Sequence, residues 1–161
     1  MELLQGTFQV QNISLTSLAA EFGTPVYVYD AGKIVQQLKT LKTAFSNSDV
    51  KIKYAAKALT NLSVLKLLLR FGSDVDVVSI QEARIALKAG FTPSQIMYTP
   101  SGVDFSEITE AVDARLTINL DNLSMLQKFG EKYRDSYPCS IRLNPHIMAG
   151  GNYKISTGHS N

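Results

Sequence analysis

The sequence predicts an α/β fold, a (β/α)8 barrel of the TIM type, of which about six strands lie in this chain. Strand-like segments alternate with amphipathic helices, which predicts a parallel sheet. The strands begin near residues 26, 52, 75, 96, 116 and 139, so the repeat is about 20 to 26 residues long. No glycine-rich phosphate loop follows the first strand, as it would in a dinucleotide-binding sheet. The uniform repeat therefore favours the closed barrel over an open, doubly wound sheet.

The expected strands are short runs rich in β-branched and aromatic residues, bounded by turn residues. A Thr-Pro step at 24–25 leads into the first strand, and the strand that starts near residue 52 runs to a lysine. The six segments are Val26–Asp30, the run up to Lys57, residues 74–79, Ile96–Thr99, Leu116–Leu120 and Cys139–Asn144.

Helix boundaries follow from capping residues and from glycines. Ser14, Asn61 and Asp104 are expected N-caps, and Ser79 forms a capping box with Glu82. Gly23, Gly72 and Gly90 mark helix ends. The expected helices are Leu15–Phe22, Lys33–Phe45, one from Asn61 to Gly72, Gln81–Ala89, one after Asp104, and Leu123–Tyr133.

Composition narrows the function classes. The 161 residues are 45% hydrophobic and carry a net charge of +2 without a basic cluster, so neither nucleic acid nor an anionic membrane is an expected partner. A small polar ligand fits better. The start of the chain has no signal-peptide pattern, and we expect a cytoplasmic protein. Cys139 is the single cysteine, which excludes an internal disulfide and a cysteine metal cluster, and we expect it to be buried.

The segment KYAAKALTN, residues 53–61, contains the most informative lysine of the chain. If Ile52 and Tyr54 face the helices, strand alternation points Ala55 and Lys57 inward. A small alanine below a lysine leaves room for a flat ring, and an unprotonated lysine amine forms imines with aldehydes. The alternative is a solvated lysine at the end of a strand, which is the commoner situation for lysines in general.

In a barrel of this class the carboxyl ends of the strands form the active face. Lysine, aspartate and arginine on that rim form a charged constellation suited to a small anionic ligand. Asp76 lies between two valines, where a carboxylate needs a partner, and Lys57 is the obvious candidate. Asp121 can equally be a helix cap, and Arg142 an ordinary rim residue. The rim comprises Lys57, residues 76–79, Thr99, residues 119–121 and residues 142–144.

Five motifs follow one another along the chain: GTPVYVYD, KYAAKALTN, VDVVS followed by a glutamate and KAGF, INLDN, and RLNPHIMAGGNYKISTG. Together they resemble the amino-terminal half of the pyridoxal-phosphate-dependent diaminopimelate decarboxylases, which belong to the alanine-racemase-like barrel class. The resemblance covers essentially the whole sequence. The earlier motifs are shared with ornithine and arginine decarboxylases, whereas the last is closer to diaminopimelate decarboxylase.

The resemblance implies specific roles. Lys57 forms the Schiff base that attaches pyridoxal 5'-phosphate, Asp76 lies beside Lys57 and the cofactor, and Arg142 stands behind the cofactor ring. The implied reaction is decarboxylation of meso-diaminopimelate to lysine, the last step of lysine biosynthesis. The resemblance also implies that the full-length enzyme is a homodimer. Alternatives are decarboxylation of another basic amino acid and a non-catalytic barrel that binds pyridoxal phosphate. His159 receives no role.

The resemblance also sets an expected domain organisation. Residues 1–25 form an amino-terminal segment that packs partly on a β domain absent from this sequence, and residues 26–161 form the first part of the barrel. Six strands cannot close an eight-stranded barrel, so we expect the sequence to be truncated. The remaining cofactor contacts of such enzymes, including a histidine, a glycine-rich phosphate loop and a glutamate, then lie elsewhere. We therefore expect the 161-residue piece alone to be inactive.

Overall fold

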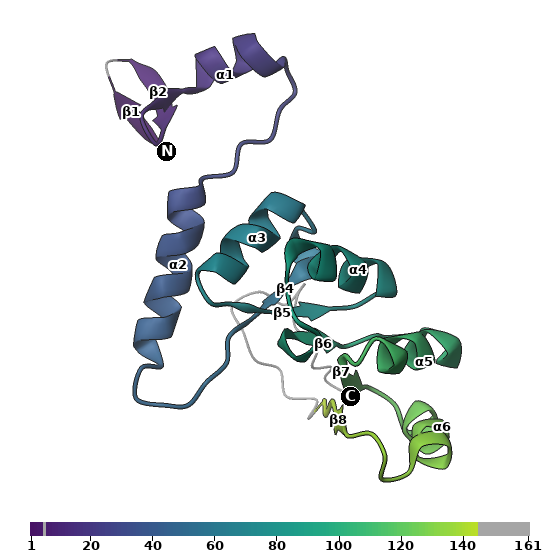
Figure 1. Cartoon of the computed structure of the whole chain (residues 1–161). Coiled ribbons are helices and arrows are strands. Elements are labelled where there is room, and N and C mark those ends of the chain that lie inside the picture. Colours follow the sequence, from purple (N-terminus) through teal and green to yellow (C-terminus); the bar gives the residue numbers. More distant parts are fainter. Residues whose placement is uncertain (5, 145–161) are drawn as a thin grey trace, which may run out of the picture.

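The computed structural model describes residues 1–4 and 6–144 and contains two separate sheets. The larger is a parallel sheet in which five strands follow chain order (Figure 1). Its strands are β4 (Lys53–Ala55), β5 (Asp74–Val77), β6 (Ile96–Tyr98), β7 (Thr117–Leu120) and β8 (Cys139–Ile141).

The four helices that follow β4, β5, β6 and β7 connect the strands of this sheet and follow one another along one side of it, whereas the helix Ala31–Ala44 precedes β4 (Figure 1). Because each connecting helix returns the chain to start the neighbouring parallel strand, the arrangement is a series of consecutive β/α units, as the barrel prediction requires. The helices are α2 (Ala31–Ala44), α3 (Leu62–Arg70), α4 (Ile80–Ala89), α5 (Phe105–Asp113) and α6 (Leu123–Tyr133), with short 3-10 turns η1 (Ala56–Ala58) and η2 (Pro93–Gln95).

The two faces of the parallel sheet differ in burial. On the face covered by helices, Val75, Val77, Ile96, Tyr98 and Ile118 are fully buried and form the core with residues of α3 to α6. The opposite face, here called the inner face, is only half-buried and mostly polar. It consists of Lys53, Ala55, Asp74, Asp76, Met97, Thr117 and Asn119, with Thr99 just past the end of β6.

Most of the expected helix ends are confirmed. Ser14 caps α1 (Leu15–Phe22), Asn61 caps α3, and the Ser79 hydroxyl accepts from the Glu82 amide at 3.2 Å. Glu82 completes this cap by accepting from the Val78 amide rather than from Ser79 itself. Gly90 ends α4 with φ of 107°, a left-handed conformation that glycine adopts without strain. Asp104 occupies the N-cap position of α5 as expected, but its side chain makes no capping hydrogen bond.

The expected first strand, Val26–Asp30, is absent from both sheets, so the described residues contain five of the six predicted parallel strands. Residues 26–29 have no regular secondary structure and are exposed, with Tyr27 at 87%. The composition of this segment fits a pleated surface, but a strand also requires a neighbouring strand with which to pair. Among the described residues, 1–4 and 6–144, no strand pairs with this segment.

A small antiparallel sheet at the start of the chain was not predicted. It comprises β1 (Glu2–Leu4), β2 (Thr7–Val10) and β3 (Ile13–Ser14). Gln11 and Asn12 link β2 to β3 with φ of 51° and 64°, and Val10 pairs with Ile13. Two left-handed residues between paired strands are the signature of a tight hairpin, and the asparagine was the available signal.

Two further properties follow from the described elements. Cys139 begins β8 as expected but is half-buried rather than buried, because β8 is the last strand of the described sheet. Within residues 1–4 and 6–144, no helix combines the length and the hydropathy needed to cross a membrane.

Candidate functional site

Lys57 lies at the carboxyl end of β4, but two residues beyond the end of the strand. The strand stops at Ala55, and Lys57 is in the 3-10 turn η1, so the expectation that strand alternation continues to Lys57 is wrong. Ala56 is fully buried and anchors the turn, and the Thr60 hydroxyl donates to its carbonyl at 3.0 Å. The Tyr54 hydroxyl donates to the Leu59 carbonyl at 3.2 Å. These contacts fix the backbone around Lys57, whose side chain is exposed.

Asp76 lies on the neighbouring strand, next to β4. It pairs in register with Ala55, the last residue of β4 before the turn that carries Lys57. Its Oδ1 accepts a hydrogen bond from the Thr99 hydroxyl at 2.6 Å. The partner of this half-buried carboxylate is therefore Thr99, and the expectation that Lys57 fills that place is wrong.

Thr99 joins Asp76 to a third strand. The Asn119 side-chain amide donates to Thr99 Oγ1 at 3.3 Å, and the Thr99 backbone N–H donates to the Val77 carbonyl at 2.8 Å. Asp76, Thr99 and Asn119 thus form a polar ladder across β5, β6 and β7. Sequence reasoning placed Thr99 and Asn119 on the rim without a role. Their shared alternation with Met97 and Thr117 was the signal that could have linked them.

A second pair of charges lies lower on the inner face, further from the rim. Lys53 and Asp74 are opposite each other in the β4–β5 register, and their side chains form an ion pair of 3.3 Å. The other ion pair among the described residues joins Arg84 to Glu110 on the helices. Lys53 is therefore neutralised, and Lys57 is the lysine of β4 and its turn that remains available at the rim.

Arg142 reaches the same rim from the far side of the sheet. Its backbone N–H donates to the Leu120 carbonyl at 2.7 Å, which extends the pairing of β8 with β7 beyond Ile141. Three inter-strand spacings separate β5 from β8, roughly 14 Å along the sheet. The structure therefore places Lys57 directly after β4 and Asp76 on the neighbouring strand β5, whereas Arg142 follows β8 at the other edge of the sheet.

Asp121 is the acidic neighbour of Arg142. A hydrogen bond from Ser101 is the largest cause that lowers the pKa of the Asp121 carboxyl; burial opposes it, and the charge of Arg142 contributes. The alternative assignment of Asp121 as a helix cap is wrong, because Asn122 caps α6 and accepts from the Met125 amide at 2.9 Å. Ser101 was not singled out from the sequence.

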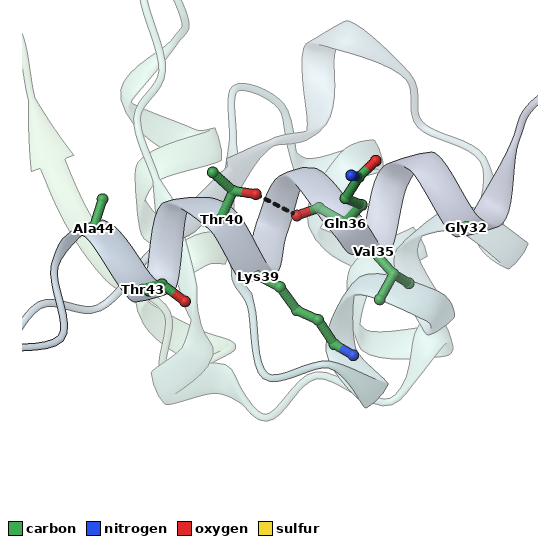
Figure 2. Close-up of a pocket in the computed structure, with 7 residues that line it drawn as sticks. All are labelled: Gly32, Val35, Gln36, Lys39, Thr40, Thr43 and Ala44. Carbon is green, nitrogen blue, oxygen red and sulfur yellow. Dashed lines mark hydrogen bonds between the residues drawn. The ribbon is translucent and has the colours of Figure 1, made fainter.

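A surface hollow lies along α2, away from these strand ends (Figure 2). All of its lining residues come from this one helix, and none belongs to the rim. Figure 2 shows the hydrogen bond that the Thr40 hydroxyl donates to the Gln36 carbonyl, at 3.0 Å, within the helix. The hollow brings no titratable groups from different elements together, so the strand ends are the better candidate site. Its lining residues are Gly32, Val35, Gln36, Lys39, Thr40, Thr43 and Ala44.

Comparison with known families agrees with the geometry of the strand ends. Residues 31–161 match the family model described as "Pyridoxal-dependent decarboxylase, pyridoxal binding domain". The chain belongs to this family. The description of the family names pyridoxal, the cofactor expected from the sequence, and the family assignment confirms the expected relationship.

Curated relatives and solved structures narrow the relationship. Diaminopimelate decarboxylase of Methanothermobacter thermautotrophicus is 37% identical over 156 residues, which are 96% of this chain and 36% of the relative. A crystal structure of diaminopimelate decarboxylase from Helicobacter pylori complexed with L-lysine has a TM-score of 0.73 and 34% identity, covering 86% of this chain and 37% of that one. Lysine/ornithine decarboxylase from Vibrio vulnificus complexed with putrescine has a TM-score of 0.73 and 28% identity, covering 80% and 35%.

These comparisons confirm the barrel fold class, since the solved relatives superpose on most of the chain. The chain spans somewhat more than a third of the length of the curated relatives that it matches. The residues at the strand ends also fit pyridoxal phosphate by their chemistry. Lys57 offers an exposed primary amine for the aldehyde, and a carboxylate and a guanidinium lie on the same rim.

Proposed function

We propose that this protein decarboxylates meso-diaminopimelate to lysine with pyridoxal phosphate as its cofactor. One observation supports the proposal above the others: Lys57 lies in the turn directly after β4, and Ala55, the last residue of β4, pairs in register with Asp76. A primary amine and a carboxylate thus lie at the carboxyl ends of two adjacent strands, the active edge of a β/α fold. The family match gives this juxtaposition its chemical meaning.

Each of the three predicted site residues has a role in this proposal. Lys57 Nζ holds the cofactor covalently, because a primary amine condenses reversibly with an aldehyde. Asp76 presents a carboxylate to a cationic atom of the ligand beside Lys57. Arg142 contributes positive charge to the same rim, from the end of β8. When bound, pyridoxal phosphate supplies the ring that accepts the electrons released as carbon dioxide leaves.

The substrate part of the proposal rests on the relatives. The curated relatives named diaminopimelate decarboxylase are 31% to 40% identical to this chain over most of its length. The second candidate is decarboxylation of lysine or ornithine, which the likeness to the Vibrio vulnificus enzyme favours at 28% identity. The lower identity makes it the second choice.

Assembly, location and domain packing belong to the same proposal. We expect a homodimer and a cytoplasmic location, and we expect residues 1–25 to pack partly on a β domain while residues 26–161 contribute to the barrel. The separate antiparallel sheet of β1 to β3 agrees with a segment that packs outside the parallel sheet. His159 lies outside the described residues, and no role is proposed for it.

The activity is tested by supplying the complete protein, loaded with pyridoxal phosphate, with one amino acid at a time. Carbon dioxide release is measured from meso-diaminopimelate, L-lysine and L-ornithine. The proposal expects a kcat/KM for meso-diaminopimelate well above the other two. Loss of turnover in Lys57→Ala, with turnover kept in Lys51→Ala, connects the activity to the site, since Lys51 is an exposed lysine before β4. A preference for L-ornithine or L-lysine would favour the second candidate.

A further inference from the structure

The polar ladder on the inner face has a fixed hydrogen-bond direction. A threonine hydroxyl carries one proton, and Thr99 gives it to Asp76 Oδ1, because an ionised carboxylate can only accept. Thr99 Oγ1 then has only lone pairs left, so Asn119 must present its amide N–H to it, at 3.3 Å. The hydrogen bonds are therefore donated from Asn119 to Thr99 and from Thr99 to Asp76, and the series ends on the charged carboxylate of Asp76.

This order leaves one oxygen of Asp76 for a ligand. Oδ1 is held by Thr99, and among residues 1–4 and 6–144 no side chain or backbone group donates to Oδ2. Ala55, which pairs with Asp76, has no polar side chain to compete for that oxygen. Asp76 is thus in register with the last residue of β4, and the turn that carries Lys57 begins at the next residue.

We propose that Thr99 and Asn119 are positioning residues that orient the Asp76 carboxylate toward the ligand held at Lys57. The inference rests on the proposed function, since it assumes that pyridoxal phosphate binds at Lys57. Thr99 suits the task because its β-branched side chain has few rotamers, and its backbone N–H is bonded to Val77 at 2.8 Å. A rigid donor restricts the rotation of the aspartate and lowers the entropy lost on binding.

A purely structural role is the alternative, in which the ladder only ties three strands together. The backbone already joins these strands, since Asp76 pairs with Met97 and Met97 with Thr117. A structural ladder would affect the melting temperature alone. A positioning ladder also affects how tightly the cofactor binds, and it acts through Asp76.

The test measures the affinity of the complete apoprotein for pyridoxal phosphate, by titration without substrate, together with the melting temperature. Thr99→Val keeps the shape and removes the hydroxyl, and we expect it to weaken binding about tenfold, the effect of one hydrogen bond to a charged group. Thr99→Ser should restore near wild-type affinity. Asn119→Leu, one step further from the charge, should weaken binding less than Thr99→Val. Thr117→Val is the matched control, because the Thr117 hydroxyl on the same face has no partner among the described residues.

The decisive step repeats Thr99→Val in an Asp76→Ala background. If Thr99 acts through Asp76, the second substitution adds no further loss of affinity. Equal losses in both backgrounds, or wild-type affinity in Thr99→Val, would overturn the inference even where Lys57→Ala abolishes binding. If Lys57→Ala itself leaves binding unchanged, the proposed function fails instead. Should Thr99→Val not fold, the comparison of Thr99→Ser with Asn119→Leu decides: equal affinity in the two would overturn the inference.

Discussion

At the scale of single residues, two aspartates on β5 have different surroundings although both face inward. Asp74 is paired with Lys53 at 3.3 Å, whereas Asp76 is bonded to a neutral hydroxyl and keeps one oxygen free. We expect Asp76→Ala to lower kcat/KM at least about tenfold with an unchanged circular dichroism spectrum, since a contact to a charged group is lost. Asp74→Asn is the control and should stay within about twofold of wild-type activity. Near wild-type turnover in Asp76→Ala would show that this carboxylate is merely structural.

Two tyrosine hydroxyls provide a second residue-scale test. The Tyr98 hydroxyl is buried against the helices and has no hydrogen-bond partner among the described residues, whereas the Tyr137 hydroxyl donates to the Leu116 carbonyl. We expect Tyr98→Phe to leave the free energy of unfolding unchanged or raise it, and Tyr137→Phe to lower it by about 1 kcal/mol. Urea denaturation compares the two variants.

Alkaline pH sharpens the Tyr98 test. Burial, followed by the nearby carboxylates of Glu107 and Glu110, raises the pKa of Tyr98 to about 12. The folded state therefore favours the neutral phenol, and this stabilisation is complete below about pH 10 and lost as the pH rises toward 12. The loss of stability between about pH 9 and pH 11 should be smaller in Tyr98→Phe than in wild type. An identical loss of stability in wild type and Tyr98→Phe would contradict the raised pKa of Tyr98.

At the scale of elements, helices α4 and α5 begin with different caps. The Ser79 hydroxyl accepts from the Glu82 amide, but the Asp104 side chain makes no capping bond. Ser79→Ala should lower the free energy of unfolding by about 1 kcal/mol, while Asp104→Ala should change it by less than about 0.5 kcal/mol. Thermal or urea unfolding measures both, and equal losses would show that the Asp104 side chain caps its helix in solution.

Local chemistry predicted the elements whose ends depend on neighbouring residues. Helix Leu123–Tyr133 has the predicted bounds, and Gly90 ends α4, because periodicity and glycine act within a few residues. Strands depend on partners far along the chain, so the pattern of Val26–Asp30 did not reveal that it stays unpaired here. The 3-10 turn that contains Lys57 was not predicted for a similar reason, since it places Ala56 in the core directly after β4.

At the scale of the whole molecule, the repeat predicted which residues share one edge of the sheet, but not which of them touch. Lys57 and Asp76 could be assigned to adjacent strands because consecutive strands pair in most β/α folds. The bond from Thr99 to Asp76 depends on register, which the sequence leaves open by one residue in either direction. Arg142 follows β8, which lies at the other edge of the sheet from β4. Membership of the same rim therefore did not indicate how far Arg142 lies from Lys57 and Asp76.

A polypeptide of these 161 residues should associate in solution and should not release carbon dioxide from meso-diaminopimelate. Among the described residues, β4 and β8 are edge strands with no neighbour on one side, and apolar side chains before α2 are exposed, with Phe22 at 66% and Tyr27 at 87%. Light scattering after size-exclusion chromatography gives the mass, and the decarboxylation assay with added cofactor gives the activity. A monomer with a sharp unfolding transition and measurable turnover would contradict both expectations.

The attachment of pyridoxal phosphate to Lys57 is tested most directly by reduction and peptide mapping. The complete protein is loaded with cofactor, reduced with borohydride, digested and analysed by mass spectrometry, so that the modified lysine is identified without any assay of activity. The proposal predicts a pyridoxyl group on the peptide that contains residues 53–61, at Lys57 and not at Lys53, whose amine is paired with Asp74. Stoichiometric modification of a different lysine, with Lys57 unmodified, would contradict it.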